Sequence, residues 1–159
     1  MFAVLGPQAA NFRLTGQRKP RTGSRSTNAG PRNAYQCKDG LYVCLSSSTQ
    51  KMAERLFRSI GRPEFITDPR YATNAERVKH AEELDAVIGE FIVQRTQAEN
   101  VAFFEKAEVT IGPIYDIRQI FEDPHFLARE LLADYPDADM ETFPMHHVVP
   151  RMSGTPGSI

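Results

Sequence analysis

The sequence GRPEFITDPRYATNAER, residues 61–77, leads into the longest helical pattern of the chain, and the rest of the fold is predicted around it. Thr73 precedes Glu76 by three residues, the spacing at which two side chains can cap a helix start reciprocally. Apolar residues then recur every three or four positions as far as Phe91, which predicts one amphipathic helix. Two prolines in the lead-in exclude a continuous helix there and predict a structured loop. The charged residues mostly fall off the apolar face and are expected to remain in water: Lys79, Glu82, Glu83 and Asp85.

A β-hairpin is predicted on the amino-terminal side of this helix. Two short runs rich in Tyr, Val, Cys and Leu flank residues 38–40, which contain the turn dipeptide Asp-Gly. A two-residue loop would make Cys37 and Cys44 diagonal neighbours about 7–8 Å apart, and a three-residue loop would place them on opposite faces. We therefore expect two reduced, buried thiols and no disulfide.

The remaining elements alternate between short helices and short strands. A helix is predicted after residues 46–49, which offer several possible N-caps, and Thr96 with Glu99 has the spacing of a second capping box. Further helix starts and strands are predicted at Asp116, Asp123-Pro124, residues 131–135 and residues 145–149. The pattern indicates an α+β fold: a helix-rich small domain with short antiparallel strands, flanked by extended linkers.

Composition places the chain among ordinary globular proteins. Its 159 residues are 41% hydrophobic and 25% charged, which is enough for one domain with a core. No apolar run approaches the roughly 20 residues that span a bilayer, and the first residues lack the pattern of a signal peptide, so we expect a cytoplasmic protein.

Charge is distributed unevenly along the chain. Residues 1–38 hold seven basic residues and no acidic one, which leaves 12 basic and 20 acidic residues in the remainder, a balance of −8. Such a basic segment can be a nucleic-acid-binding arm, a solvated connector or a basic rim for a phosphorylated ligand. Between Phe12 and Tyr35 this segment holds no aromatic residue, which disfavours stacking on single-stranded nucleic acid.

The sequence contains no recognisable catalytic pattern. His146 and His147 are neighbours on a predicted strand and would point to opposite faces, which disfavours a shared metal ion. The sequence also lacks a nucleophile elbow, a phosphate-binding loop and a dinucleotide fingerprint. Pattern alone indicates an α+β domain without visible catalytic machinery.

A series of short motifs changes this interpretation. In chain order they are Asn33–Val43, Gly61-Arg62-Pro63, Asp68–Asn74, Arg77, Thr96, Glu99, Gly112–Tyr115, Asp123-Pro124-His125, Arg129 and Pro150–Pro156. In this order and spacing, over almost the whole chain, they resemble the class III CoA-transferases, the CaiB/BaiF family that includes formyl-CoA and carnitine CoA-transferases.

The resemblance implies a division of the chain and a set of partners. Residues 1–32 would be a helix tail and basic linker from a large Rossmann-like domain, residues 33–149 the small domain, and residues 150–159 a return linker. The family's nucleophilic aspartate would lie before Met1, so no catalytic residue is assigned here and the chain alone is expected to be inactive. The implied substrates are an acyl-CoA thioester and a carboxylic acid acceptor, with no tightly bound cofactor. The implied assembly is an interlocked homodimer, with no membrane partner and nucleic acid disfavoured.

The resemblance also suggests which residues face CoA or substrate. The family has a glycine-rich loop before the small domain, and the corresponding residues 26–31 contain one glycine. The candidates are Arg25, Asn28, Ala29 and Gly30 in that loop, with Thr49 and Gln50 beyond the hairpin. A helix cap explains Thr49 and Gln50 equally well, and a solvated linker charge explains Arg25 equally well.

Two alternative functions stay open. A racemase branch of the family has a glutamate at the end of the hairpin, where residues 48–50 contain no acid, and this weakly disfavours an isomerase acting on acyl-CoA. The second alternative is a non-catalytic interaction module whose basic arm binds nucleic acid.

Overall fold

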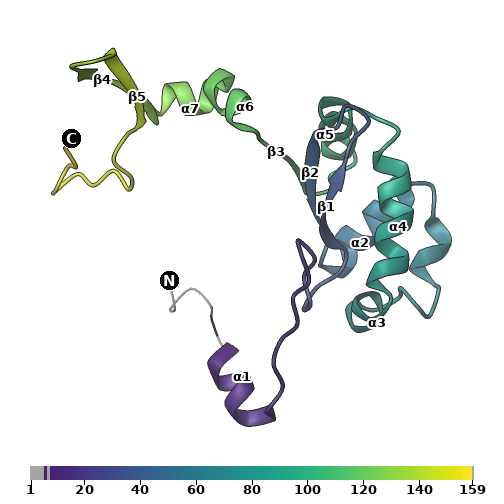
Figure 1. The fold of residues 1–159 in the computed structure, drawn as a ribbon. Helices are drawn as coiled ribbons and strands as arrows, with labels where there is room; N and C mark the ends of the chain where they lie inside the picture. Colours follow the sequence, from purple (N-terminus) through teal and green to yellow (C-terminus); the bar gives the residue numbers. More distant parts are fainter. Residues whose placement is uncertain (1–5, 7, 159) are drawn as a thin grey trace. The chain divides into compact units, whose positions relative to one another are not determined.

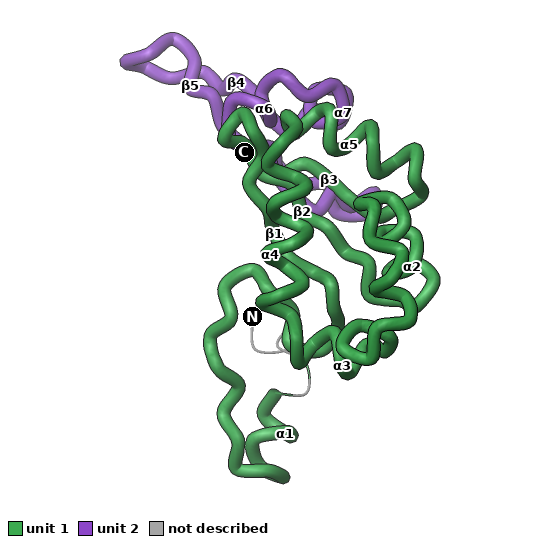
Figure 2. Tube along the Cα trace, turned by 90° about the vertical axis from the view of Figure 1, so that its right-hand side faces the viewer, with its two compact units in different colours: residues 1–113 green, residues 114–159 purple. Residues whose placement is uncertain are grey.

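The computed structural model describes residue 6 and residues 8–158. The chain divides into two compact units, Met1–Pro113 and Ile114–Ile159, which Figure 2 colours separately. The first unit contains α1 (Gln8–Thr15), β1 (Arg32–Gln36), β2 (Tyr42–Ser46), α2 (Gln50–Ser59), a 3-10 helix (Pro63–Ile66), α3 (Asn74–Lys79), α4 (Ala81–Ile92), α5 (Gln97–Lys106) and most of β3 (Ile111–Ile114). The second contains α6 (Ile117–Glu122), α7 (Pro124–Ala128), β4 (Leu132–Asp137) and β5 (Glu141–His146). The predicted α+β fold class is confirmed.

The predicted hairpin is present, with the longer of the two loops considered. Tyr35 pairs with Val43 across the antiparallel strands, and the Cys37 amide donates to the Leu41 carbonyl over 2.8 Å, so the loop has three residues. The two cysteines therefore lie on opposite faces: both are free thiols, Cys37 buried and Cys44 exposed. The expectation that both are buried is wrong for Cys44, because side chains alternate between faces along a strand.

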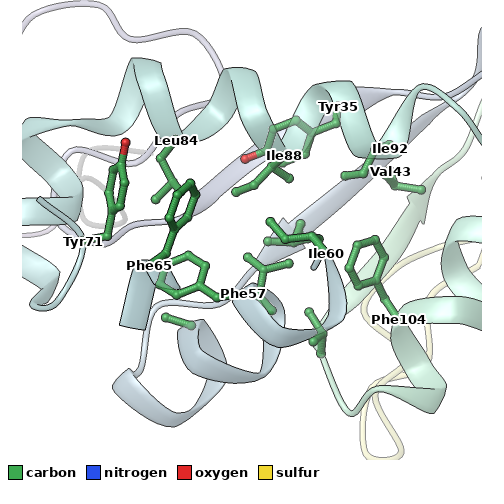
Figure 3. Close-up of a cluster of buried hydrophobic side chains, with 14 of the residues drawn as sticks. Tyr35, Val43, Phe57, Ile60, Phe65, Tyr71, Leu84, Ile88, Ile92 and Phe104 are labelled. Carbon is green, nitrogen blue, oxygen red and sulfur yellow. The ribbon is translucent and has the colours of Figure 1, made fainter. Parts of the chain in front are cut away.

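The core of the first unit lies between this hairpin and the helices α2, α4 and α5. α4 packs on β1, α5 packs on β2, and β3 adds to the sheet beside β2, in the order β1-β2-β3 (Figure 1). Figure 3 shows Leu84, Ile88 and Ile92 of α4 on one side of the cluster, with Phe57 and Ile60 on the other. The buried apolar residues are Tyr35, Cys37, Val43, Leu45, Ala53, Leu56, Phe57, Ile60, Phe65, Tyr71, Leu84, Ile88, Ile92, Phe104 and Val109.

The long helix predicted after Thr73 is two helices, α3 and α4, separated at His80 (φ −102°, ψ 26°). α3 buries Arg77, whereas α4 buries apolar residues against the hairpin, so the two segments have different partners and the chain changes direction between them. Thr73 caps α3 by accepting from the Glu76 amide at 3.3 Å. The Glu76 carboxylate pairs with Lys79 at 2.6 Å, so the reciprocal half of the predicted capping box is not formed.

The lead-in before α3 is a structured loop, as predicted, with one 3-10 turn at Pro63–Ile66. Phe65 and Tyr71 are both buried and their ring centroids are 4.6 Å apart. The lead-in is therefore ordered by two aromatic side chains that it contributes to the core.

The second unit has well-formed local structure. Asp116 and Gln119 form a capping box at α6, and Asp123 caps α7 by accepting from the amides of His125 and Phe126. β4 and β5 pair as an antiparallel hairpin in which Tyr135 lies opposite Phe143. None of the residues 114–158 is buried. No helix in the described part of the chain is both long and apolar enough to cross a bilayer.

Candidate functional site

Arg25, the first of the predicted ligand-facing residues, is fastened to α4. Its Nε donates to Asp85 Oδ2 over 2.7 Å, and its Nη1 donates to Glu82 Oε1 over 3.2 Å. The hydrogen bond to Asp85 raises the pKa of the Arg25 guanidinium, and burial opposes this change. Arg25 is therefore neither a free cation nor a simple solvated charge: it ties the loop before β1 to a helix 60 residues further along the chain.

Asp85 is the acceptor at the centre of this network. Besides Arg25, it accepts from Asn33 Nδ2 at 2.9 Å and from the Tyr35 hydroxyl at 2.6 Å. Its side chain is only 11% exposed. The expectation that Asp85 remains in water is wrong, because three donors from the loop and β1 compensate its removal from solvent. The loop, β1 and α4 thus share one polar anchor.

Tyr35 contributes its ring to the core and its hydroxyl to that anchor. Burial raises the pKa of the Tyr35 phenol far above its ordinary value, and the negative charge of Asp85 raises it further. The phenol therefore stays protonated and acts as a hydrogen-bond donor.

Asn28 and Gly30 are held by α3. The Asn74 side chain donates from Nδ2 to the Asn28 carbonyl and accepts at Oδ1 from the Gly30 amide, both over 3.1 Å. Ala29 lies between these two contacts and is partly buried. One amide side chain thus holds two of the predicted residues, with the third between them.

Arg77 joins this loop to the start of α2. Its side chain is fully buried, and its Nε donates to the Gly30 carbonyl over 2.7 Å. Its Nη1 donates to Gln50 Oε1 and to the Tyr71 carbonyl, both over 3.0 Å. Burial lowers the pKa of Arg77, which the charge of Glu54 partly offsets. One guanidinium therefore joins Gly30 in the loop to Gln50 at the start of α2, two of the predicted ligand-facing residues.

Thr49 is the N-cap of α2, where its Oγ1 accepts from the Met52 amide at 3.4 Å. Gln50 follows it and also donates to Glu54 Oε1 over 3.1 Å. The cap accounts for Thr49 structurally, and a ligand-facing role for either residue stays a prediction.

Sequence reasoning missed Asn74, Arg77 and Asp85 as determinants of this site. For Asn74 and Arg77 a signal was available: they lie three residues apart at the start of a predicted helix, so they share a helix face, and both belong to the motifs of the family resemblance. For Asp85 no local signal existed, since its position on the helix is typical of a solvated carboxylate.

A surface hollow of about 420 Å³ lies where this loop meets the beginning of α4. Residues 22, 25–27 and 78–83 line it, and Arg25 is the predicted site residue among them. Its lining combines hydroxyls, cations and carboxylates. The hollow therefore suits a polar group, and its mixed charges do not favour an anion over a cation. Within the described residues no group of three or more His, Cys, Asp or Glu is arranged to hold a metal ion.

Comparisons with known proteins agree with the motif pattern. The model of CoA-transferase family III matches residues 1–159, so the chain belongs to this family and the predicted resemblance is confirmed. The chain is 33% identical over all of its residues to the succinyl-CoA–D-citramalate CoA-transferase of Chloroflexus aurantiacus, of which it covers 40%. It is 30% identical over 97% of its length to the succinate–glutarate CoA-transferase of Agrobacterium fabrum, of which it covers 38%.

A solved structure shows the same fold. A CaiB/BaiF family protein from Brucella suis superposes with a TM-score of 0.79 and 28% identity, over 97% of this chain and 39% of that one. The chain thus spans about two fifths of the length of each of these three proteins.

Proposed function

We propose that this chain is the small-domain portion of an enzyme that moves CoA from an acyl-CoA thioester to a carboxylic acid. The observation that carries the proposal is the family match over every residue, together with the two relatives described above, whose names specify CoA-transferases acting on succinyl-CoA or succinate. A succinyl group is therefore the first donor to test.

In this proposal the covalent chemistry belongs to an aspartate outside these residues. Its carboxylate oxygen would attack the thioester carbonyl, the C–S bond would break, and the product would be an aspartyl–acyl anhydride with CoA thiolate still bound. The thiolate would then attack the aspartyl carbonyl, releasing the acid and leaving an aspartyl-CoA thioester. The acceptor carboxylate would repeat these two steps in reverse, and CoA would leave as the new thioester.

The part proposed for this chain is to hold the substrate side of a closed site. Residues 1–32 and 150–159 would be linkers and residues 33–149 the small domain, in a cytoplasmic homodimer that binds CoA as a substrate. Residues 25 and 28–30 would face the ligand from the loop, and Thr49 and Gln50 from the start of α2. The anchoring of the loop by Asp85, Asn74 and Arg77 supports this assignment, since a preorganised loop loses little entropy when a substrate binds.

A chimaera tests the proposal. The 159 residues replace the matching 40% of the Chloroflexus succinyl-CoA–D-citramalate CoA-transferase, and the parent enzyme is the positive control. Succinyl-CoA is mixed with D-citramalate, L-malate or glutarate, and the CoA thioesters are separated and quantified. We expect the chimaera to form a new thioester and the chain alone to form none.

Two results would overturn the proposal. A chimaera that is folded by circular dichroism, yet forms no new thioester with any acid, would show that the chain does not serve this reaction. Inversion of the α-carbon of an acyl-CoA, without transfer of CoA, would assign the chain to an isomerase instead.

A further inference from the structure

Two polar side chains of α3 gather segments that are distant in the sequence. Arg77 reaches the Gly30 carbonyl, 47 residues away, and Gln50 Oε1, 27 residues away. Asn74 bridges the Asn28 carbonyl and the Gly30 amide. A spacing of three residues places both side chains on one face of the helix.

The loop also contacts the backbone that it is tied to. A Cβ at Gly30 would lie 3.5 Å from the carbonyl carbon and oxygen of Arg77, so the loop packs directly on α3. The next carbonyl, that of Pro31, accepts from the Ser47 amide over 3.0 Å. Two consecutive carbonyls are thus held by α3 and by the segment that leads into α2.

The cost of burying Arg77 indicates that it serves more than stability. The side chain is fully buried, its hydrogen bonds go to two backbone carbonyls and one amide, and its Nη2 is buried without a hydrogen-bond partner among the described residues. A buried charge without a paired carboxylate is expensive, and an apolar residue at such a position is often more stable. What the guanidinium supplies here is a defined arrangement of three segments.

We propose that Arg77 and Asn74 are positioning residues, which hold residues 28–30 beside the start of α2 so that both segments present one surface to the acyl-CoA. This role rests on the proposed CoA-transferase function. Neither residue needs to touch substrate: Arg77 is inaccessible, and Asn74 acts through the backbone of the loop.

Amide hydrogen exchange on the 159-residue chain tests the positioning without any assay of activity. The variants are Asn74→Ala and Arg77→Met, and Lys79→Ala on the same helix is the matched control, since Lys79 is exposed and its ion pair among the described residues is the local one with Glu76. We expect the Gly30 amide to exchange at least tenfold faster in both variants, with the amides of Val43 and Ile88 unchanged. Loop exchange equal to that of the wild type, or rising only in step with those core amides, would overturn the proposal. Because Asn74 is partly exposed, its variant is informative even if Arg77→Met does not fold.

Kinetics in the chimaera then connect positioning to function. We expect Asn74→Ala and Arg77→Lys to raise KM for succinyl-CoA at least fivefold while kcat changes less than threefold, because Lys cannot reproduce the fork of the guanidinium. Ile88→Val, a change in the buried core, should leave KM unaltered. An unchanged KM in both the Asn74→Ala and the Arg77→Lys chimaera would refute the positioning role. A chimaera that transfers no CoA, with exchange at Gly30 accelerated as expected, would remove the proposed function and leave the positioning of the loop established.

Discussion

The two β-hairpins of this protein have similar lengths and different surroundings. β1 and β2 pair over five residues, α4 and α5 pack on them, and Tyr35, Val43 and Leu45 are buried. β4 and β5 pair over six residues, and neither strand contains a buried residue. Both hairpins are paired along their strands, but the one with buried residues is the one on which helices pack. Since a two-stranded hairpin by itself is marginally stable in water, we expect this packing to stabilise the first hairpin.

The same contrast holds for the helices. Thr96 with Glu99 and Asp116 with Gln119 form capping boxes of the same geometry, one in each unit. α5 buries Phe104, but α6 leaves Phe121 46% exposed and Ile117 68% exposed. Since apolar burial is the main source of folding free energy, we expect most of the stability to lie in the first unit.

The largest effect on stability is expected when one aromatic ring is removed from each unit in turn. We expect Phe104→Ala to lower the free energy of unfolding by about 3–5 kcal/mol, because it leaves a cavity in the core, and Phe121→Ala to change it by less than about 0.5 kcal/mol. Urea denaturation followed by circular dichroism measures both. Equal losses would show that the second unit has a core of its own, and the comparison would fail.

Removing one hydroxyl from each hairpin gives a smaller effect. Tyr35→Phe deletes the donor to Asp85, and we expect it to cost about 1.5–3 kcal/mol, as for other hydrogen bonds to a charged group. Tyr135→Phe is the matched control on β4, with an expected change within about 0.5 kcal/mol. Similar costs for the two variants, measured by urea denaturation at pH 7, would mean that the bond to Asp85 adds nothing to stability.

The dependence of stability on alkaline pH is a second test of the Tyr35 hydroxyl. Folding raises the pKa of Tyr35 above its ordinary value of 10.0, chiefly through burial and then through Asp85, so the folded state holds the proton more tightly than the unfolded state. This contribution is complete below pH 10 and is lost as the pH rises above it. We expect the melting temperature of the wild type to fall more steeply between pH 10 and pH 11 than that of Tyr35→Phe. Parallel curves for the two proteins would contradict the assigned environment.

The smallest effect is expected from the two helix caps. Thr96→Ala should lower the free energy of unfolding by about 1 kcal/mol, because α5 is part of the cooperative core. Asp116→Ala removes the equivalent cap in the second unit, and we expect amide exchange in α6 to accelerate without a shift of the main unfolding transition. A shift as large as that of Thr96→Ala would show that the two units unfold together.

Local features were predictable from sequence wherever neighbouring residues decide them. The predicted caps at Thr96, Asp116 and Asp123 satisfy amides two or three residues away, and each is present in the structure. Of the possible caps at residues 46–49, the structure uses Thr49. The family was also accessible, because its motifs are short and occur in a fixed order. The predicted ligand-facing residues could be named from that resemblance, and whether they face a ligand stays a prediction.

By itself, the sequence determined the first hairpin and most helix starts, through caps, prolines, glycines and hydrophobic periodicity, and it determined the family. It misplaced the last strand, which was predicted at residues 145–149 and lies at Glu141–His146. Only the tertiary structure decided the three-residue turn that turns Cys44 outward, the break at His80, and the networks around Asp85 and Arg77. The physical reason is separation along the chain. Partners 47 to 60 residues apart are brought together by the tertiary fold, and no local pattern records which carboxylate or guanidinium the fold will enclose.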